Sequence, residues 1–174
     1  MVLYSADDFL KLPNYEILKN NINITASEAF NHEIIRDTVG SVINEKGYIG
    51  YLIKDNKVVA CGFAKNDTTN SKTMYIHTFA VHKDYRGLGL CQMMVSEFIK
   101  RFGKKYILYL TVRTETGNEN TGAIRCYEKQ GFIMLPEVYR DHYDGKNNAM
   151  IRLPTISKNT IRKRRSRKKP RKKK

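Results

Sequence analysis

The chain has 174 residues, of which 41% are hydrophobic and 28% charged, a length that suits one globular domain with a sizeable core. No apolar run reaches the roughly 18 residues that a membrane-spanning helix needs. Residues 1–8 also lack the basic and apolar regions of a secretory signal peptide. We therefore do not expect a membrane-spanning or secreted protein.

The formal net charge of +15 is concentrated at the C-terminus. Residues 162–174 read RKRRSRKKPRKKK, with eleven Lys or Arg and no acid. The rest of the chain carries 21 basic and 17 acidic residues, a net charge of +4. A polycationic segment cannot bury apolar surface. We therefore expect one domain over residues 1–153, followed by a linker and a disordered polybasic tail over residues 154–174.

The three cysteines are Cys61, Cys91 and Cys126. An odd number at wide spacing resembles neither a disulfide framework nor a zinc site. We expect free thiols and an intracellular, reducing compartment, either cytoplasmic or nuclear. The four histidines are scattered, so the sequence predicts no metal site.

The first half of the chain contains one predicted helix and three predicted strands. Apolar residues at helical spacing predict an amphipathic helix over residues 26–38. Two alternating apolar runs, residues 48–53 and 57–63, flank the turn residues Asp55 and Asn56 and predict a β-hairpin. Residues 74–81 are rich in β-branched and aromatic side chains and predict a third strand.

The second half alternates helices with strands. Residues 91–102 place apolar side chains at i, i+3, i+4, i+7, i+8 and i+11, which predicts a helix with one wide apolar face. The other predicted elements are a buried strand over 106–112, a helix over 120–129 and two final strands over 132–135 and 149–153. Strands that first follow one another and then alternate with helices indicate an α/β fold, a mixed sheet with helices on both faces.

The segment RGLGLC, residues 86–91, stands between a predicted strand and a predicted helix. The first turn of a helix has unpaired N–H groups and a favourable dipole for an anion. Glycines permit close approach of the backbone, and Arg86 adds positive charge. The segment lacks the Lys-Ser or Lys-Thr of a Walker loop, and Gln92 stands where a dinucleotide fingerprint has its third glycine. A phosphate or pyrophosphate site and a plain glycine-rich turn both remain open.

Two longer motifs resemble those of the GNAT superfamily of N-acetyltransferases. Residues 76–91, IHTFAVHKDYRGLGLC, resemble its apolar strand, short turn and R/Q-x-x-G-x-G/A helix opening. Residues 120–132, NTGAIRCYEKQGF, are similar to its N-x-x-A-x-x-x-Y-E-K-x-G-F block. Residues 139–153 resemble its closing hairpin more loosely. The resemblance implies a GNAT-like fold, with a mostly antiparallel sheet splayed at the cofactor site, and acetyl-CoA as co-substrate.

Two features depart from the family pattern. Cys91 stands where the family usually has Gly or Ala, and residues 114–119 make the loop before Asn120 about four residues longer. The resemblance still assigns a cofactor role to each matching position. The backbone of the strand would hold the pantetheine arm, the loop and first helical residue would hold the pyrophosphate, and the start of the second helix would contact the arm near its reactive end. These positions are, in turn, Phe79, Ala80 and Val81; Arg86, Gly87, Leu88, Gly89, Leu90, Cys91 and Gln92; and Asn120 and Ala123.

The resemblance also implies catalytic roles. Tyr127 would protonate the leaving thiolate, since a phenol with a pKa near ~10 is protonated at neutral pH. A ring that simply packs against the sheet is the alternative. The central strand has no Asp or Glu, so His77 is the best candidate for the base, with Glu115 and His142 as distant alternatives on loops. Strand alternation predicts that Tyr75, His77 and Phe79 share one face. A half-buried structural histidine is the alternative there.

The predicted function is direct transfer of acetyl from acetyl-CoA to a primary amine, with a protein or peptide amine favoured over a small molecule. The alternative is a catalytically weak acyl-CoA-binding module, tethered to nucleic acid by its basic tail. For the tail itself, residues 162–174, the candidate partners are a nuclear import receptor and nucleic acid, and a silent solvated extension is the third alternative.

Overall fold

The computed structural model describes residues 1–30, 36–115, 118–140 and 146–155. In chain order the elements are β1 (Val2–Ser5), α1 (Ala6–Leu10), α2 (Tyr15–Ala29), α3 (Thr38–Asn44), β2 (Tyr48–Lys54), β3 (Lys57–Asn66), β4 (Thr73–Val81), a 3₁₀ turn (Lys83–Tyr85), α4 (Leu90–Phe102), β5 (Ile107–Glu115), β6 (Asn118–Glu119), α5 (Thr121–Lys129), β7 (Ile133–Arg140) and β8 (Lys146–Arg152).

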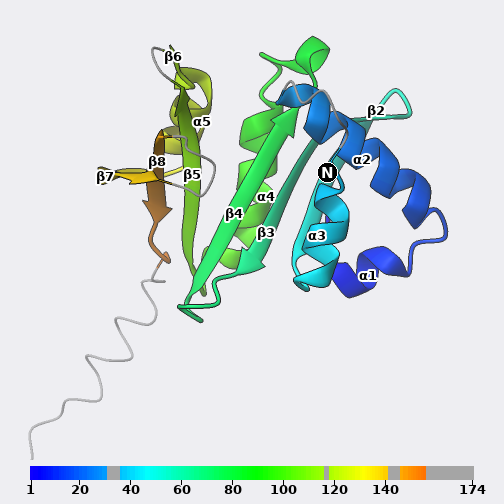
Figure 1. Ribbon diagram of the computed structural model, residues 1–174, viewed down its shortest axis with the longest axis horizontal. Coiled ribbons are helices and arrows are strands. Elements are labelled where there is room, and N and C mark those ends of the chain that lie inside the picture. Colours follow the sequence, from blue (N-terminus) through cyan, green and yellow to red (C-terminus); the bar gives the residue numbers. More distant parts are fainter. Residues whose placement is uncertain (31–35, 116–117, 141–145, 156–174) are drawn as a thin grey trace, which may run out of the picture.

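The strands form one sheet in the order β1-β2-β3-β4-β5-β8-β7, with β6 paired to the end of β5. Every neighbouring pair is antiparallel except β4 and β5, which are parallel. Helices α1, α2 and α3 cover one face of the sheet, and α4 covers the other (Figure 1). The prediction of a mixed, mostly antiparallel sheet with helices on both faces is confirmed.

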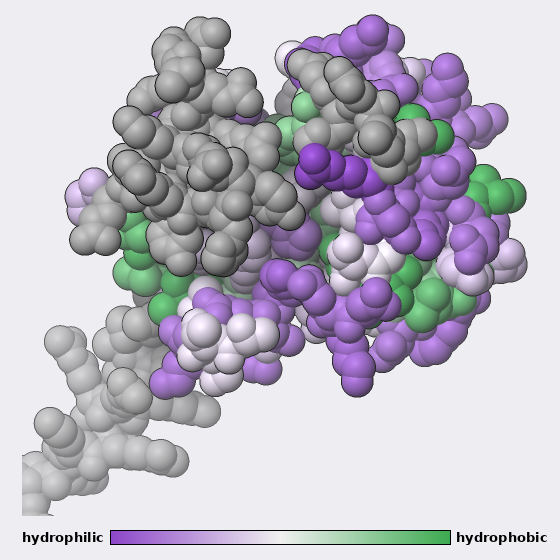
Figure 2. All heavy atoms as spheres, viewed as in Figure 1, coloured by the Kyte–Doolittle hydropathy of each residue, from purple (hydrophilic) through white to green (hydrophobic). Residues whose placement is uncertain are grey.

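Two apolar clusters separate along these faces. One contains the buried side chains of α4 and α5 and the sheet residues beneath them, and its α4 residue Phe98 is fully buried. The other joins α1, α2 and α3 to the opposite side of β2 and β3, around Phe9 and Phe63. The face shown in Figure 2 is mostly hydrophilic over α1, α2 and α3, with small, separate apolar groups, as on an ordinary water-exposed surface.

The hairpin prediction is confirmed. Strands β2 and β3 pair up to Lys54 and Lys57, and the two turn residues Asp55 and Asn56 have φ angles of 50° and 60°. Two consecutive positive φ angles are the geometry of a tight hairpin turn, which Asp and Asn tolerate better than other non-glycine residues.

The predicted helix over residues 26–38 is wrong. Helix α2 ends at Ala29 and α3 begins at Thr38, while residues 31–35 lie outside the described residues. Helix α3 starts at Thr38 because Asp37 caps it, accepting a hydrogen bond of 2.9 Å from the Gly40 N–H. The buried Asn23 of α2 donates to the same carboxylate at 2.9 Å. A contact between two elements therefore sets this boundary, and periodicity alone does not show it.

The strands β4 and β5 are splayed. They pair only through Thr73–Tyr75 and Ile107–Tyr109, and beyond this register they diverge (Figure 1). In the described part of both strands, the β5-facing edge of β4 after Tyr75 is therefore free of strand pairing. The splay that the family resemblance predicts is present.

A bulge in β4 reverses the predicted side-chain alternation. Thr78 has a φ of 55°, and the register with β3 shifts between Cys61 and Phe63. The predicted common face holds for Tyr75 and His77, whose rings stack, and is wrong for Phe79. His77 lies 5.7 Å from the ring of Phe63, on the α2 side, whereas Phe79 packs on the α4 and α5 side.

Candidate functional site

A cavity of about 550 Å³ opens where the end of β4, the loop before α4, α4 itself and α5 meet. This volume is within the range of small-molecule sites. The lining residues come from four parts of the chain: Ala29 and Phe30; Phe79, Ala80 and Val81; Tyr85, Arg86, Gly87, Gly89, Leu90, Cys91 and Gln92; and Asn120, Gly122, Ala123, Arg125, Cys126, Tyr127 and Lys129.

The structure brings most of the predicted cofactor residues to this one cavity. Leu88 is the exception among the loop residues: its side chain is 57% exposed and it does not line the cavity. Of the two predicted catalytic residues, Tyr127 lines the cavity and His77 does not.

The loop has the backbone geometry that an anion site needs. Gly87 and Gly89 have φ angles of 80° and 74°, which side-chain-bearing residues rarely adopt. A Cβ added at either position would meet no protein atom within 4 Å, so the space beside the loop is open. Gly89 is the N-cap of α4 and offers no side-chain acceptor to the first-turn N–H groups. These N–H groups are the donors that commonly bind a phosphate at a helix start.

Arg86 has a second role that the sequence did not indicate. Its guanidinium donates hydrogen bonds to the carbonyls of Val81 at 3.3 Å and of Ala29 at 3.2 Å. Nearby, the His82 Nε2 lies 3.4 Å from a Glu28 carboxylate oxygen. These contacts tie the C-terminal end of α2 to the loop. The end of α2 thus becomes a wall of the cavity, although it is more than 50 residues away in sequence.

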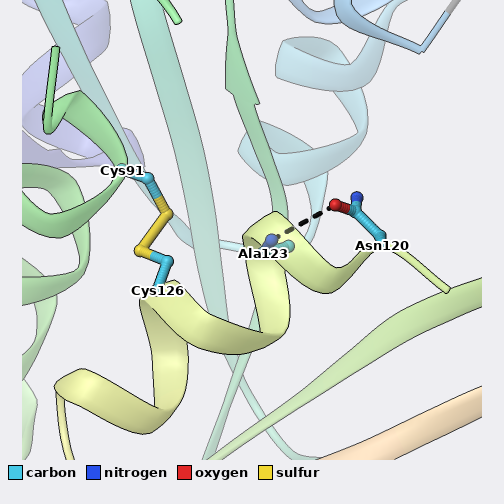
Figure 3. Close-up of a disulfide and its surroundings, with 4 residues drawn as sticks. All are labelled: Cys91, Asn120, Ala123 and Cys126. Atoms are coloured by element: carbon cyan, nitrogen blue, oxygen red, sulfur yellow. Dashed lines mark hydrogen bonds between the residues drawn. A yellow bond between two sulfur atoms is a disulfide. The ribbon is translucent and has the colours of Figure 1, made fainter. Parts of the chain in front are cut away.

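The start of α5 forms the opposite wall. The Asn120 Oδ1 accepts a hydrogen bond of 3.2 Å from the Ala123 N–H, so Asn120 is the N-cap of α5 (Figure 3). Arg125 and Lys129, one helical turn apart, also line the cavity and add positive charge beside it. Neither residue belongs to the motifs that indicate the site, although their i, i+4 spacing in a predicted helix is a usable signal.

Tyr127 is 7% exposed, and its ring lies 6.0 Å from those of both Phe79 and Phe132. Burial raises the pKa of its phenol well above the ordinary value. The hydroxyl is therefore protonated at every assay pH of interest. The packing and the proton-donor interpretations of Tyr127 are compatible, because one ring can do both.

His77 occupies a different environment. Its ring stacks on Tyr75 at 5.5 Å, its Nδ1 is 3.1 Å from the Thr78 hydroxyl, and its buried Nε2 has no hydrogen-bond partner among the described residues. Burial, with a smaller contribution from Lys65, lowers the pKa of His77 to about 4. The imidazole is therefore neutral at pH 7.

The expectation of free thiols is wrong for two of the three cysteines. A disulfide joins Cys91 of α4 to Cys126 of α5, with the Cα atoms 6.6 Å apart (Figure 3). The fold packs these helices side by side, which spacing along the chain does not reveal. Closing a loop of 35 residues stabilises a fold by about 4 kcal/mol in the chain-entropy estimate. Cys61 is free and buried, and the cysteine pattern no longer argues for a reducing compartment.

Among the described residues, no group of three or more His, Cys, Asp or Glu is arranged to hold a metal ion. No helix within those same ranges is long and apolar enough to cross a membrane.

The sequence profile of the acetyltransferase (GNAT) family matches residues 15–132. The chain belongs to the GNAT family of acetyltransferases. This membership confirms the predicted activity class, an N-acetyltransferase that uses acetyl-CoA as the acetyl donor. The matched range contains the loop, the cavity and Tyr127.

Similar proteins agree with this assignment. N-alpha-acetyltransferase 30 of Saccharomyces cerevisiae is 24% identical over 169 residues, covering 92% of this chain and 93% of the yeast protein. An aminoglycoside 6′-N-acetyltransferase complexed with coenzyme A superposes with a TM-score of 0.68 at 14% identity, over 90% of this chain and 99% of that one. The ribosomal-protein-S18-alanine N-acetyltransferase of Escherichia coli superposes with a TM-score of 0.60 at 18% identity, over 90% of this chain and 95% of that one. The structural likeness confirms the fold.

The burial of His77 predicts a pH-dependent loss of stability. Its folded pKa of about 4 is below the unfolded value of 6.5. Between these values the unfolded state binds a proton that the folded state does not, so stability falls as the pH decreases. Urea unfolding measures the free energy of unfolding at pH 7.0 and at pH 4.5. We expect this free energy to fall between the two pH values by about 2 kcal/mol more in the parent chain than in His77→Phe. Equal losses in the two proteins would contradict this account of His77.

Proposed function

We propose that the cavity binds acetyl-CoA and that the enzyme transfers the acetyl group to the α-amine of a protein or peptide. The observation that carries this proposal is the convergence of an open, glycine-rich helix start and the hydroxyl-bearing Tyr127 on one cavity. A plain turn would not need both features at the same place.

The lining residues fit the parts of coenzyme A. The pyrophosphate would lie at the first turn of α4, against the N–H groups of Leu90, Cys91 and Gln92. The side chains of Arg86, Arg125 and Lys129 supply positive charge around an anion at that position.

The pantetheine arm would follow β4. Because the splay leaves one edge of Phe79, Ala80 and Val81 without a strand partner, their backbone groups are available to an extended ligand. Asn120 and Ala123 on the far wall would contact the arm close to Tyr127.

Acetyl transfer to an amine forms a C–N bond and breaks the C–S bond of the thioester. Protonation of the departing sulfur makes it a better leaving group. Tyr127, whose phenol is protonated at neutral pH, would donate a proton to that sulfur. Its ring is held in place by Phe79 and Phe132, which restricts where the hydroxyl can point.

The attacking amine must lose a proton. His77, the predicted base, does not line the cavity and packs on the opposite side of the sheet, so we propose that this proton passes to solvent water and that His77 acts only indirectly. A pKa of about 4 makes it a weak base. We therefore give His77 a smaller share of the rate than Tyr127.

The acceptor class is supported by the relatives. The yeast relative, matched over nearly its whole length, is named an N-alpha-acetyltransferase, and the Escherichia coli structural neighbour is named for acetylation of an alanine of ribosomal protein S18. Aminoglycoside acetyltransferases are also structural neighbours, which keeps small amines in the test. The segment 139–148, part of the predicted closing hairpin, includes residues 141–145, which lie outside the described residues.

The tail, residues 162–174, also lies outside the described residues, of which Thr155 is the last. The Thr155 N–H donates to the Gly103 carbonyl at 3.1 Å, beside the C-terminal end of α4. That end exposes Lys100, Arg101, Lys104 and Lys105. The tail and this end of the domain carry the same sign of charge, so one polyanion could contact both. We propose nucleic acid as the partner, through its phosphates.

Replacement of Tyr127 tests the catalytic assignment. With a panel of peptides and an aminoglycoside as acceptors, we expect Tyr127→Phe to lower kcat for the best peptide by about 10² to 10³. The KM for acetyl-CoA should remain within about threefold, because the phenylalanine ring keeps the packing. His77→Gln should lower kcat by less than about tenfold. A Tyr127→Phe enzyme with unchanged kcat, or a preference for the aminoglycoside, would contradict the corresponding part of the proposal.

Charge neutralisation tests the tail. We expect the chain to bind a double-stranded nucleic acid at 50 mM salt, with log K falling against log salt with a slope of about −5 or steeper, as six or more phosphate contacts require. Replacing the eleven Lys and Arg of residues 162–174 by Gln should abolish this binding and leave the affinity for acetyl-CoA unchanged. Tight binding of the parent chain to an import receptor, without measurable binding to nucleic acid, would overturn the assignment.

A further inference from the structure

The disulfide Cys91–Cys126 lies in the wall of the cavity. Both cysteines line the cavity, one in the first turn of α4 and the other on α5, one turn after Gly122 (Figure 3). The first turn of α4 supplies one side of the proposed cofactor site, and the start of α5 with Tyr127 supplies the other. The bond is therefore the covalent link between the pyrophosphate wall and the wall that carries Tyr127.

We propose that Cys91 and Cys126 form a reversible thiol–disulfide site, modified by low-molecular-weight disulfides such as oxidised glutathione, and that the disulfide holds the cofactor site in its binding-competent shape. The inference rests on the proposed binding of coenzyme A at the loop. It adds a modification site and the direction of its effect.

The two cysteines differ in access, which sets the order of the reaction. Cys91 is partly exposed, whereas Cys126 is 7% exposed. The N-terminal turn of α4 and the positive charge of Arg86 and Arg125 beside the cavity favour a thiolate at Cys91, the form that attacks a disulfide. Cys126, held next to it by the packing of α5, is positioned for the second, intramolecular step.

The reaction balances without a further reagent. The Cys91 thiolate attacks one sulfur of oxidised glutathione, forms a mixed disulfide and releases one glutathione. The Cys126 sulfur then attacks the Cys91 sulfur, forms the intramolecular bond and releases the second glutathione. Two electrons pass from the cysteines to the glutathione disulfide, and the two thiol protons end on the two glutathione thiols.

The structure also gives the direction of the effect. The cavity is open while the disulfide is formed, so the bond does not obstruct the ligand space. Once the bond is broken, the start of α5 is held to the rest of the site by the packing of side chains such as Ile124 and Tyr127. A site that must be ordered on binding has a lower affinity than one that is already ordered. Reduction is therefore expected to weaken cofactor binding.

Cys61 provides a matched control. It is fully buried in β3, and burial raises the pKa of its thiol to about 12, so it remains an unreactive thiol. A Cys61→Ala variant should keep every redox response of the parent chain.

The test measures binding of desulfo-coenzyme A, which has the pyrophosphate but no thiol, by calorimetry on the full chain. One sample is oxidised with glutathione disulfide and the other is reduced with a phosphine. We expect reduction to raise Kd at least fivefold in the parent chain and in Cys61→Ala. The double variant Cys91→Ser, Cys126→Ser should give one Kd, close to the reduced value, in both conditions. Alkylation and peptide mass mapping confirm the state of each cysteine.

The outcomes separate this inference from the proposed function. Absence of desulfo-coenzyme A binding in both redox states would overturn the cofactor site itself. Equal Kd values in the two states, with mapping that shows the bond formed in one and broken in the other, would overturn the inference alone, even if the melting temperature changes. Failure of the two thiols to link after treatment with glutathione disulfide would overturn it as well.

Discussion

The site depends on the interrupted pairing between β4 and β5. The two strands pair as far as Tyr75 and Tyr109 and then separate, so the second half of β4 has one unpaired edge. Buried backbone groups need partners, and an unpaired strand edge is therefore a binding surface for an extended ligand. The bulge at Thr78 adds to this by turning Phe79 toward α5, where its ring supports Tyr127.

Around that edge, segments distant in sequence form one cavity. The glycines at 87 and 89 shape the start of α4, the Asn120 cap fixes the start of α5, and Arg86 attaches the end of α2. The uncapped start of α4 and the side chains of Arg86, Arg125 and Lys129 make an electropositive site without a buried charge. The same arrangement explains why Cys91 and Cys126 meet, because both are in helices that converge on the cavity.

Local patterns in the sequence predicted the elements whose boundaries are set locally. Asp55 and Asn56 predicted the hairpin, the apolar period over residues 91–102 predicted α4, and Asn120 marked the start of α5. The boundary between α2 and α3 could not be predicted in this way, because it is fixed by Asn23 reaching Asp37 across the fold. The bulge at Thr78, which moves the Phe79 side chain to the other face of the sheet, likewise cannot be predicted from the alternating pattern of that strand.

The candidate site shows the same division. Short motifs identified the loop and Tyr127, because their chemistry requires particular residue types at fixed spacing. The hydrogen bond from Arg86 to Ala29 and the pairing of Cys91 with Cys126 are tertiary contacts between segments that share no pattern. The burial that makes His77 a weak base also comes from its neighbours, above all Tyr75 and Phe63.

The most direct measurement of the central claim is a calorimetric titration of acetyl-CoA into the parent chain, Gly89→Ala and Gly131→Ala. Both glycines have positive φ angles, 74° and 82°, so the two substitutions cause similar backbone strain, and of the two only Gly89 lines the cavity. The account predicts binding to the parent chain, at least tenfold weaker binding to Gly89→Ala, and parental affinity in Gly131→Ala. No binding by the parent chain, or equal affinities in the two variants, would contradict it.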